Sequence, residues 1–131
     1  MSGWQYYNPS PDGKHVGDCV VRAIACALET DWFTAYAILC TKGMELLDMP
    51  SANHVWGAVL RDHGFRSRAI PDTCTACYTV ADFARDHKNG TFVLGTGSHA
   101  VTVADGGTIY DSWDSSGEVP IIYFYKEDAK K

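Results

Sequence analysis

The stretch SHAVTVADGGTIYD, residues 98–111, decides the fold of this chain. Small and β-branched residues over Ser98–Ala104 are followed by Asp-Gly-Gly and then by Thr108–Asp111, the pattern of two short strands joined by a tight turn. Similar runs flank this stretch at Thr91–Leu94 and Pro120–Tyr125, and glycine or aspartate separates the runs. The C-terminal part of the chain therefore predicts a meander of antiparallel strands.

Upstream of this meander, apolar residues recur with the period of an amphipathic helix. The helices that we expect are Cys19–Leu28 with Asp18 as N-cap, Asp31–Thr41 with a stop at Gly43, Ala52–His63, and a fourth that a capping box opens at Thr79 and that runs to about His87. Phe65–Ile70 is predicted as one further strand. Helices followed by a strand meander indicate an α+β fold, with N-terminal helices packed on a C-terminal antiparallel β-sheet.

Length, composition and charge limit the class of protein. The chain has 131 residues, of which 46% are hydrophobic and 21% charged, so we expect a single domain over residues 1–131. A formal net charge of −5 argues against a nucleic-acid partner. The N-terminus lacks a signal peptide and no segment approaches the roughly 20 apolar residues of a membrane span. With an odd number of cysteines, five, the sequence predicts a cytoplasmic protein without membrane association.

Cys19 stands at the first turn of the first expected helix. Free backbone N–H groups and the positive end of the helix dipole favour a thiolate there, and the same N–H groups can stabilise an oxyanion. Arg22 adds positive charge one turn later, whereas Asp18 opposes thiolate formation. A lone cysteine is more often a small buried hydrophobe, so Cys19 needs partners to be a candidate nucleophile.

A histidine and a carboxylate follow Cys19 in chain order. His99 opens the strand that ends at Ala104, and from there its ring can face the end of a helix. If Asp105–Gly107 is a three-residue loop, Asp111 lies on the same face as His99; if the loop is only two residues long, His99 faces Asp114 instead. Either carboxylate would accept the imidazole Nδ1–H and fix the tautomer, as in the triads of thiol hydrolases.

These segments resemble a known family. His99-Ala100-Val101 and Asp111-Ser112-Trp113 are similar to the His-Ala-Val and Asn-Ser-Trp segments of the papain-like cysteine protease superfamily, and Cys19 matches its nucleophile. The resemblance implies a minimal papain-like fold, close to the bacteriocin-processing peptidases, in which Asp replaces Asn as the orienting residue. It favours Asp111 over Asp114, and it gives Trp113 the role of shielding the triad from water.

The sequence also departs from the family. Only Gly17 and Cys19 are kept around the nucleophile, and His99 follows Cys19 by 80 residues rather than 130–150. Gly13 occupies the position of the glutamine that completes the family's oxyanion hole. Gln5 or Asn8, both on the N-terminal arm, are the candidates to replace it.

The expected function is a cysteine-dependent hydrolase, a peptidase or isopeptidase that acts on a peptide or protein substrate through a thioester intermediate. Two alternatives remain: acyl transfer to an amine with the same triad, as in transglutaminase-like enzymes, and a non-catalytic protein-binding module. The binding module would use an aromatic groove formed by Trp4, Tyr6, Tyr7 and Trp113. Cys74 and Cys77 form a lone C-x-x-C without further ligands at metal-site spacing, so we expect no metal and no cofactor.

Overall fold

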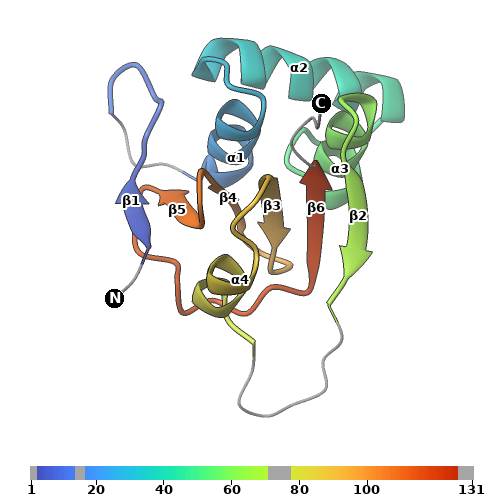
Figure 1. The fold of residues 1–131 in the computed structure, drawn as a ribbon. Coiled ribbons are helices and arrows are strands. Elements are labelled where there is room, and N and C mark those ends of the chain that lie inside the picture. Colours follow the sequence, from blue (N-terminus) through green and yellow to red (C-terminus); the bar gives the residue numbers. More distant parts are fainter. Residues whose placement is uncertain (1–2, 14–16, 71–77, 127–131) are drawn as a thin grey trace, which may run out of the picture.

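The computed structural model describes residues 3–13, 17–70 and 78–126. Figure 1 shows helices on both faces of one mixed sheet. Cys74 and Cys77 lie outside the described residues. In chain order the elements are β1 (Trp4–Tyr6), α1 (Cys19–Ala27), α2 (Trp32–Leu46), α3 (Asn53–Asp62), β2 (Arg66–Ala69), α4 (Val80–Asp86), β3 (Thr91–Gly95), β4 (Ala100–Ala104), β5 (Thr108–Asp111) and β6 (Ile122–Lys126).

The sheet has six strands in the order β1-β5-β4-β3-β6-β2. Strands β3, β4 and β5 form an antiparallel meander as predicted, but the prediction that the last strand continues it is wrong, because β6 crosses back to pair antiparallel to β3 and β2 pairs antiparallel to β6. The prediction of a wholly antiparallel sheet is wrong at one edge, where β1 pairs parallel to β5. The N-terminal arm therefore adds a strand beside the end of the meander, and its exposed aromatic residues gave no alternating pattern from which that pairing could be read.

Alternation along the strands builds a hydrophobic core on each face of the sheet. Val93 and Phe124 point toward α1, α2 and α3 and join the larger core. Their neighbours Phe92 and Leu94 point the opposite way and pack with Phe83 of α4. The molecule is thus layered, with three helices on one face of the sheet and α4 on the other, and the fold class is α+β.

Three of the four helices begin and end within two residues of the predicted bounds. The capping box of α4 is present, with the Thr79 hydroxyl accepting from Asp82 N–H and the Asp82 carboxylate accepting from Thr79 N–H. The prediction that α2 stops at Gly43 is wrong, because the helix continues to Leu46 and ends at Leu47 in the left-handed region. A Cβ on Gly43 would lie 2.7 Å from the carbonyl oxygen of Asp48, so this glycine permits close packing inside the helix.

The first two helices meet at a sharp angle. Asp31 caps α2, its side chain accepting a hydrogen bond from Thr34 N–H, and α1 and α2 are bent by 108° at the break between them. Among the described residues no single helix is long and apolar enough to span a membrane, and only this bent pair passes the test of length and composition.

Candidate active site

Cys19, His99 and Asp111 meet where α1 begins, where β4 starts and where β5 ends. The pairing of Ala104 with Thr108 confirms the three-residue loop, and β4 and β5 therefore place His99 beside Asp111. The imidazole Nε2 of His99 lies 2.6 Å from Asp111 Oδ2. The imidazole also interacts with the thiol of Cys19, as does the backbone N–H of Ala100, and both interactions favour the thiolate. The three side chains form a continuous chain of contacts.

The electrostatics of this chain of contacts favour an ion pair. Burial raises the pKa of the Cys19 thiol, but the hydrogen bonds from His99 and Ala100 and the charges of His99 and Arg22 outweigh burial and lower it. Burial disfavours the charged form of His99, yet the hydrogen bonds with Asp111 and Cys19 raise its pKa to about 9. The two shifts act in the same direction and favour a thiolate–imidazolium pair, the reactive form of a cysteine nucleophile, over the neutral pair.

Asp111 is the most heavily hydrogen-bonded side chain of the site. Its Oδ2 accepts from His99 and, at 2.7 Å, from the Ser115 hydroxyl. Its Oδ1 accepts from Arg22 Nη2 at 3.0 Å and from Ser112 N–H at 2.7 Å. Burial raises the pKa of Asp111, and these bonds, with His99 and Ser115 foremost, lower it below its ordinary value. The carboxylate thus stays ionised although it is 1% exposed.

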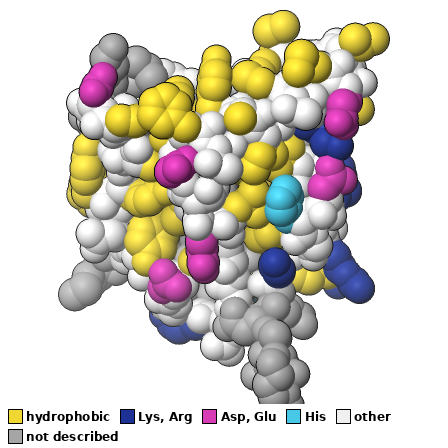
Figure 2. Space-filling view, turned by 90° about the horizontal axis from the view of Figure 1, so that it is seen from above, with side chains coloured by type: hydrophobic (Ala, Val, Ile, Leu, Met, Phe, Trp, Pro, Cys, Tyr) yellow, Lys and Arg dark blue, Asp and Glu magenta, His cyan; other side chains and the backbone are white. Residues whose placement is uncertain are grey.

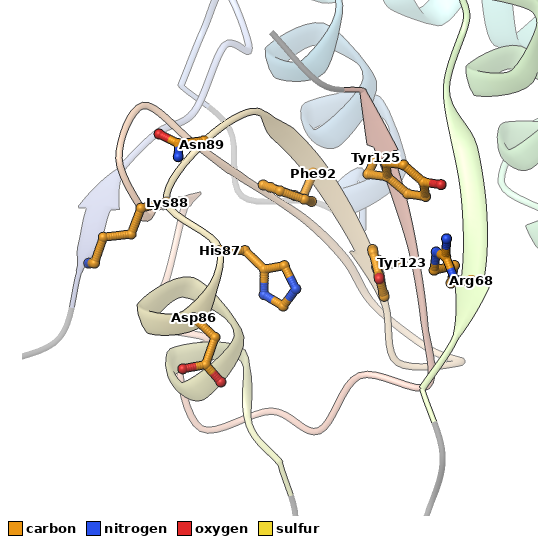
Figure 3. Close-up of a pocket in the computed structure, with 8 residues that line it drawn as sticks. All are labelled: Arg68, Asp86, His87, Lys88, Asn89, Phe92, Tyr123 and Tyr125. Carbon is orange, nitrogen blue, oxygen red and sulfur yellow. The ribbon is translucent and has the colours of Figure 1, made fainter.

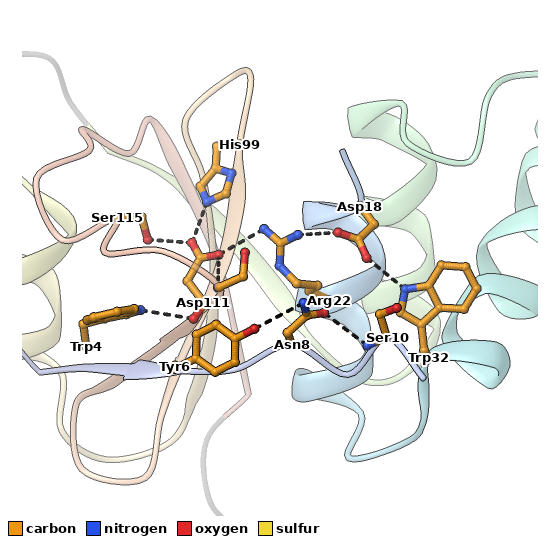
Figure 4. A network of polar contacts seen from close by, with 11 residues as sticks. Trp4, Tyr6, Asn8, Ser10, Asp18, Arg22, Trp32, His99, Asp111 and Ser115 are labelled. Carbon is orange, nitrogen blue, oxygen red and sulfur yellow. Dashed lines mark hydrogen bonds and ion pairs between the residues drawn. The ribbon is translucent and has the colours of Figure 1, made fainter. Parts of the chain in front are cut away.

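Two expectations about this site are wrong. His99 contacts Asp111 through Nε2 rather than Nδ1, so Nδ1 is the ring nitrogen left for Cys19. Asp18 makes no side-chain cap of α1. Its carboxylate instead pairs with Arg22 and accepts from Trp32 Nε1 at 3.0 Å (Figure 4). The ion pair with the buried guanidinium takes the carboxylate away from the helix N–H groups, and little of its charge is left to oppose a thiolate.

The N-terminal arm holds the end of β5 in place. The Asp111 carbonyl oxygen accepts from Trp4 Nε1 at 3.1 Å and from Tyr7 N–H at 2.8 Å. Tyr7 is half-buried, with its ring 5.9 Å from Tyr110, whereas Trp4 and Tyr6 remain exposed. The arm therefore fixes both the backbone and the register of the orienting residue.

Trp113 lies against the imidazole. Its ring centroid is 4.8 Å from that of His99, with the planes tilted by 44°. The indole is 44% exposed, so one face covers the imidazole while the other meets solvent. The side chain of His99 is left 9% exposed, which makes its contact with Asp111 poorly accessible to water.

Backbone N–H groups at the start of α1 are the nearest built-in oxyanion donors. The first intrahelical bond runs from Arg22 N–H to Asp18 O, so the N–H groups of residues 19–21 precede the helical ladder. The side-chain candidates are placed otherwise. Gln5 is paired with Tyr110 in the middle of β1, and the Asn8 amide donates to the Tyr6 hydroxyl at 3.4 Å. The N–H groups of the helix terminus can receive a developing negative charge without a contribution from either side chain.

An apolar cavity of about 400 Å³ opens next to the nucleophile. Residues on both sides of Cys19 line it, together with α2 and the segment before α3. Figure 2 shows that hydrophobic side chains also gather on the face seen from above, and exposed ones of α2 include Phe33 and Tyr36. The lining residues are Gly17, Asp18, Val20, Val21, Trp32, Tyr36, Leu39, Met49, Pro50 and Ser51.

A second cavity, of about 350 Å³, lies beside α4 and contains none of the triad (Figure 3). Its lining is mixed in charge, and aromatic residues of β3 and β6 form much of the wall. Within the described part of the chain, no group of three or more His, Cys, Asp or Glu side chains is arranged to hold a metal ion. The residues around this cavity are Arg68, Asp86, His87, Lys88, Asn89, Phe92, Tyr123 and Tyr125.

Sequence reasoning missed Ser115 and gave Arg22 a different role. Arg22 lies far from Asp111 in sequence, and Ser115 lies in an irregular segment after β5. Neither residue belongs to a motif with a characteristic spacing. Cys26 is half-buried, and burial raises the pKa of its thiol to about 12, which makes this second cysteine of α1 a poor nucleophile. Comparisons with protein-family models, with curated proteins and with solved structures each find no match for this chain.

Proposed function

We propose that this protein is a papain-like cysteine hydrolase that cleaves amide bonds of a peptide or protein substrate. The observation that carries the proposal is the imidazole of His99, which interacts with the Cys19 thiol and whose Nε2 lies 2.6 Å from the Asp111 carboxylate. A thiolate, a proton donor and an orienting group are the parts that acyl transfer through a thioester requires.

In the proposed reaction the Cys19 thiolate attacks the carbonyl carbon of the substrate. The tetrahedral oxyanion lies near the N–H groups that begin α1. His99 gives its proton to the leaving amine as the carbon–nitrogen bond breaks, and a thioester with Cys19 remains. A water molecule then gives a proton to His99 and attacks the thioester, which releases the carboxylic acid and restores the thiolate–imidazolium pair.

The apolar cavity supports a peptide as the substrate. Val20 and Val21 follow the nucleophile directly in α1 and line the cavity, so the cavity and Cys19 belong to the same end of that helix. A volume of about 400 Å³ is enough for a large apolar or aromatic side chain. We therefore expect substrates with such a side chain near the cleaved bond to be preferred.

Selective alkylation tests the nucleophile. Limiting iodoacetamide at about pH 6 should modify Cys19 first, because only a thiolate reacts at that pH. The preference should disappear in His99→Ala and persist in Cys40→Ala, which removes a half-buried free cysteine of α2. Even modification of all cysteines, or none, would contradict an activated thiol and favour a non-catalytic binding module.

Trapping of the intermediate tests the reaction. Peptide thioesters that carry a large apolar residue should acylate Cys19, and mass spectrometry should locate the acyl group on the peptide that contains Cys19. Hydroxylamine should release it, because thioesters react readily with that nucleophile. Cys19→Ala should show no adduct. An adduct that forms equally in Cys19→Ala would place the chemistry elsewhere.

A further inference from the structure

Arg22 contacts the orienting carboxylate from the side opposite the imidazole. Its Nη2 donates to Asp111 Oδ1 at 3.0 Å, and its Nη1 pairs with Asp18 (Figure 4). The guanidinium is 5% exposed, and its Nε–H has no hydrogen-bond partner among the described residues. The position of the guanidinium thus satisfies its two ion pairs and leaves its Nε–H without a partner among the described residues. The two carboxylates therefore determine where the guanidinium lies.

The charges of the site explain what this contact does. An asparagine orients an imidazole without adding charge, whereas Asp111 adds a full negative charge in a site from which water is largely excluded. Without a counter-charge, that carboxylate and the Cys19 thiolate would be two anions on either side of one imidazolium. Arg22 offsets part of the carboxylate's charge, and it shares its own positive charge between Asp111 and Asp18.

We propose that Arg22 is a positioning residue for the reaction proposed above: its contact with Asp111 offsets part of the carboxylate's negative charge, so that Asp111 can take the place of the uncharged side chain used in the resembled family. The inference rests on the proposed function for its catalytic meaning. It also makes residues 22 and 111 a coupled pair, so that a change at one is compensated by a change at the other.

The pairing reverses a simple expectation about Asp111→Asn. From the resemblance alone, asparagine should be well tolerated at this position. In this site the single change removes one of the two carboxylates paired with Arg22. The negative charge beside the imidazolium is then gone while the positive charge of Arg22 remains, and both effects favour loss of the imidazole proton. Asp111→Asn should therefore be impaired alone and restored by Arg22→Gln.

A double-mutant cycle tests the pairing. The variants are Arg22→Gln, Asp111→Asn and the combination, with Arg85→Gln as the control, because Arg85 also forms ion pairs but is exposed on α4. The readout is the rate of Cys19 alkylation from about pH 4 to pH 10. We expect each single change to shift one limb of the profile by about one pH unit, which lowers the rate there about tenfold. The double variant should return to within about threefold of wild type.

A titration of the His99 ring by NMR separates this inference from the proposed function. In Asp111→Asn the midpoint should fall from its value of about 9, and in the double variant it should rise again. Additive losses in the double variant, in both alkylation and titration, would overturn the pairing and leave Arg22 a purely structural ion pair. A His99 midpoint that recovers in the double variant, together with no enhanced alkylation of Cys19 in wild type, would refute the proposed hydrolase. It would still support the pairing of Arg22 with Asp111.

A conservative variant covers the case in which Arg22→Gln does not fold. Arg22→Lys keeps the positive charge but provides a single ammonium for the two carboxylates. It should retain the wild-type pH limits of alkylation and lose mainly thermal stability. A profile shifted as far as that expected for Arg22→Gln would show that the charge of Arg22 is not what matters, and would overturn the proposal.

Discussion

Replacement of Cys19 by serine should change how the stability of the protein depends on pH. In the unfolded chain the imidazole loses its proton near pH 6.5 and the thiol loses its proton near pH 9. In the folded protein the thiol pKa is lowered and that of His99 is raised to about 9. If the folded protein holds the thiolate–imidazolium pair, the two groups together hold one proton in both states between pH 6.5 and 9, and in wild type they contribute no slope.

In the Cys19→Ser variant the stability does depend on pH, because there is no thiol to lose a proton on folding. The folded imidazolium then holds one proton more than the unfolded imidazole above pH 6.5, and stability must fall as the pH rises. Each pH unit corresponds to about 1.4 kcal/mol. The rise of the His99 pKa from 6.5 to about 9 sets an upper limit of roughly 3.4 kcal/mol on the total loss. The actual loss is smaller, because Cys19 itself contributes to the raised pKa of His99.

Urea unfolding followed by tryptophan fluorescence, at pH values from about 6 to 9, measures this difference. Wild type and the control Cys40→Ser should show parallel curves, since Cys40 lies on α2 outside the triad. The Cys19→Ser curve should fall away from both as the pH rises. If all three curves stay parallel over this range, the folded protein holds no thiolate–imidazolium pair, and the electrostatic argument is refuted.

Three further changes test the surroundings of the triad and the fold. Ser115→Ala removes the hydroxyl that donates to Asp111 at 2.7 Å, and urea unfolding should show a loss of about 1.5–3 kcal/mol, as expected for a hydrogen bond to a charged group. Phe83→Ala opens the core under α4 and should cost about 3–5 kcal/mol by the same measurement, while alkylation of Cys19 is unchanged. Gly107→Ala should lower the thermal midpoint more than Gly106→Ala: both glycines have positive φ, but a Cβ at Gly107 would also lie 2.7 Å from a backbone carbonyl oxygen of α4. Equal losses would show that this contact does not matter.

The sequence predicted the hairpin that carries the site but left its loop open. Two glycines allow either a two-residue or a three-residue loop, and composition does not separate them. In the structure Asp105, Gly106 and Gly107 all have positive φ, so aspartate provides the third left-handed residue. Aspartate tolerates that conformation better than most residues. The three-residue loop requires Asp105 to adopt a left-handed conformation. The preference of aspartate for that conformation is too weak to predict the loop length from the sequence.

The polar surroundings of Asp111 could not be predicted, for a different reason. Arg22 lies 89 residues before Asp111, and Ser115 lies in an irregular segment after β5. Local periodicity reports which face of an element is buried, but it does not report which polar side chains meet across elements. Asp18 illustrates the difference, because its position at the start of a helix predicted a cap while a distant indole and a buried guanidinium determined its actual contacts.

One buried hydrogen bond helps to align the thiol with the imidazole. The hydroxyl of Thr102 in β4 donates to the carbonyl oxygen of Ala23 in α1 at 2.8 Å, and Thr102 is fully buried. Cys19 lies about one helical turn before Ala23, and His99 lies three residues before Thr102, so both reactive groups stand a short distance in the same direction from this contact. A carbonyl oxygen inside a helix already accepts one hydrogen bond from the helix backbone. The second hydrogen bond, from Thr102, holds α1 against the sheet and limits sliding of the helix along its axis. The β4–β5 hairpin brings His99 next to Asp111, whereas placing Cys19 beside them requires a contact between the helix layer and the sheet.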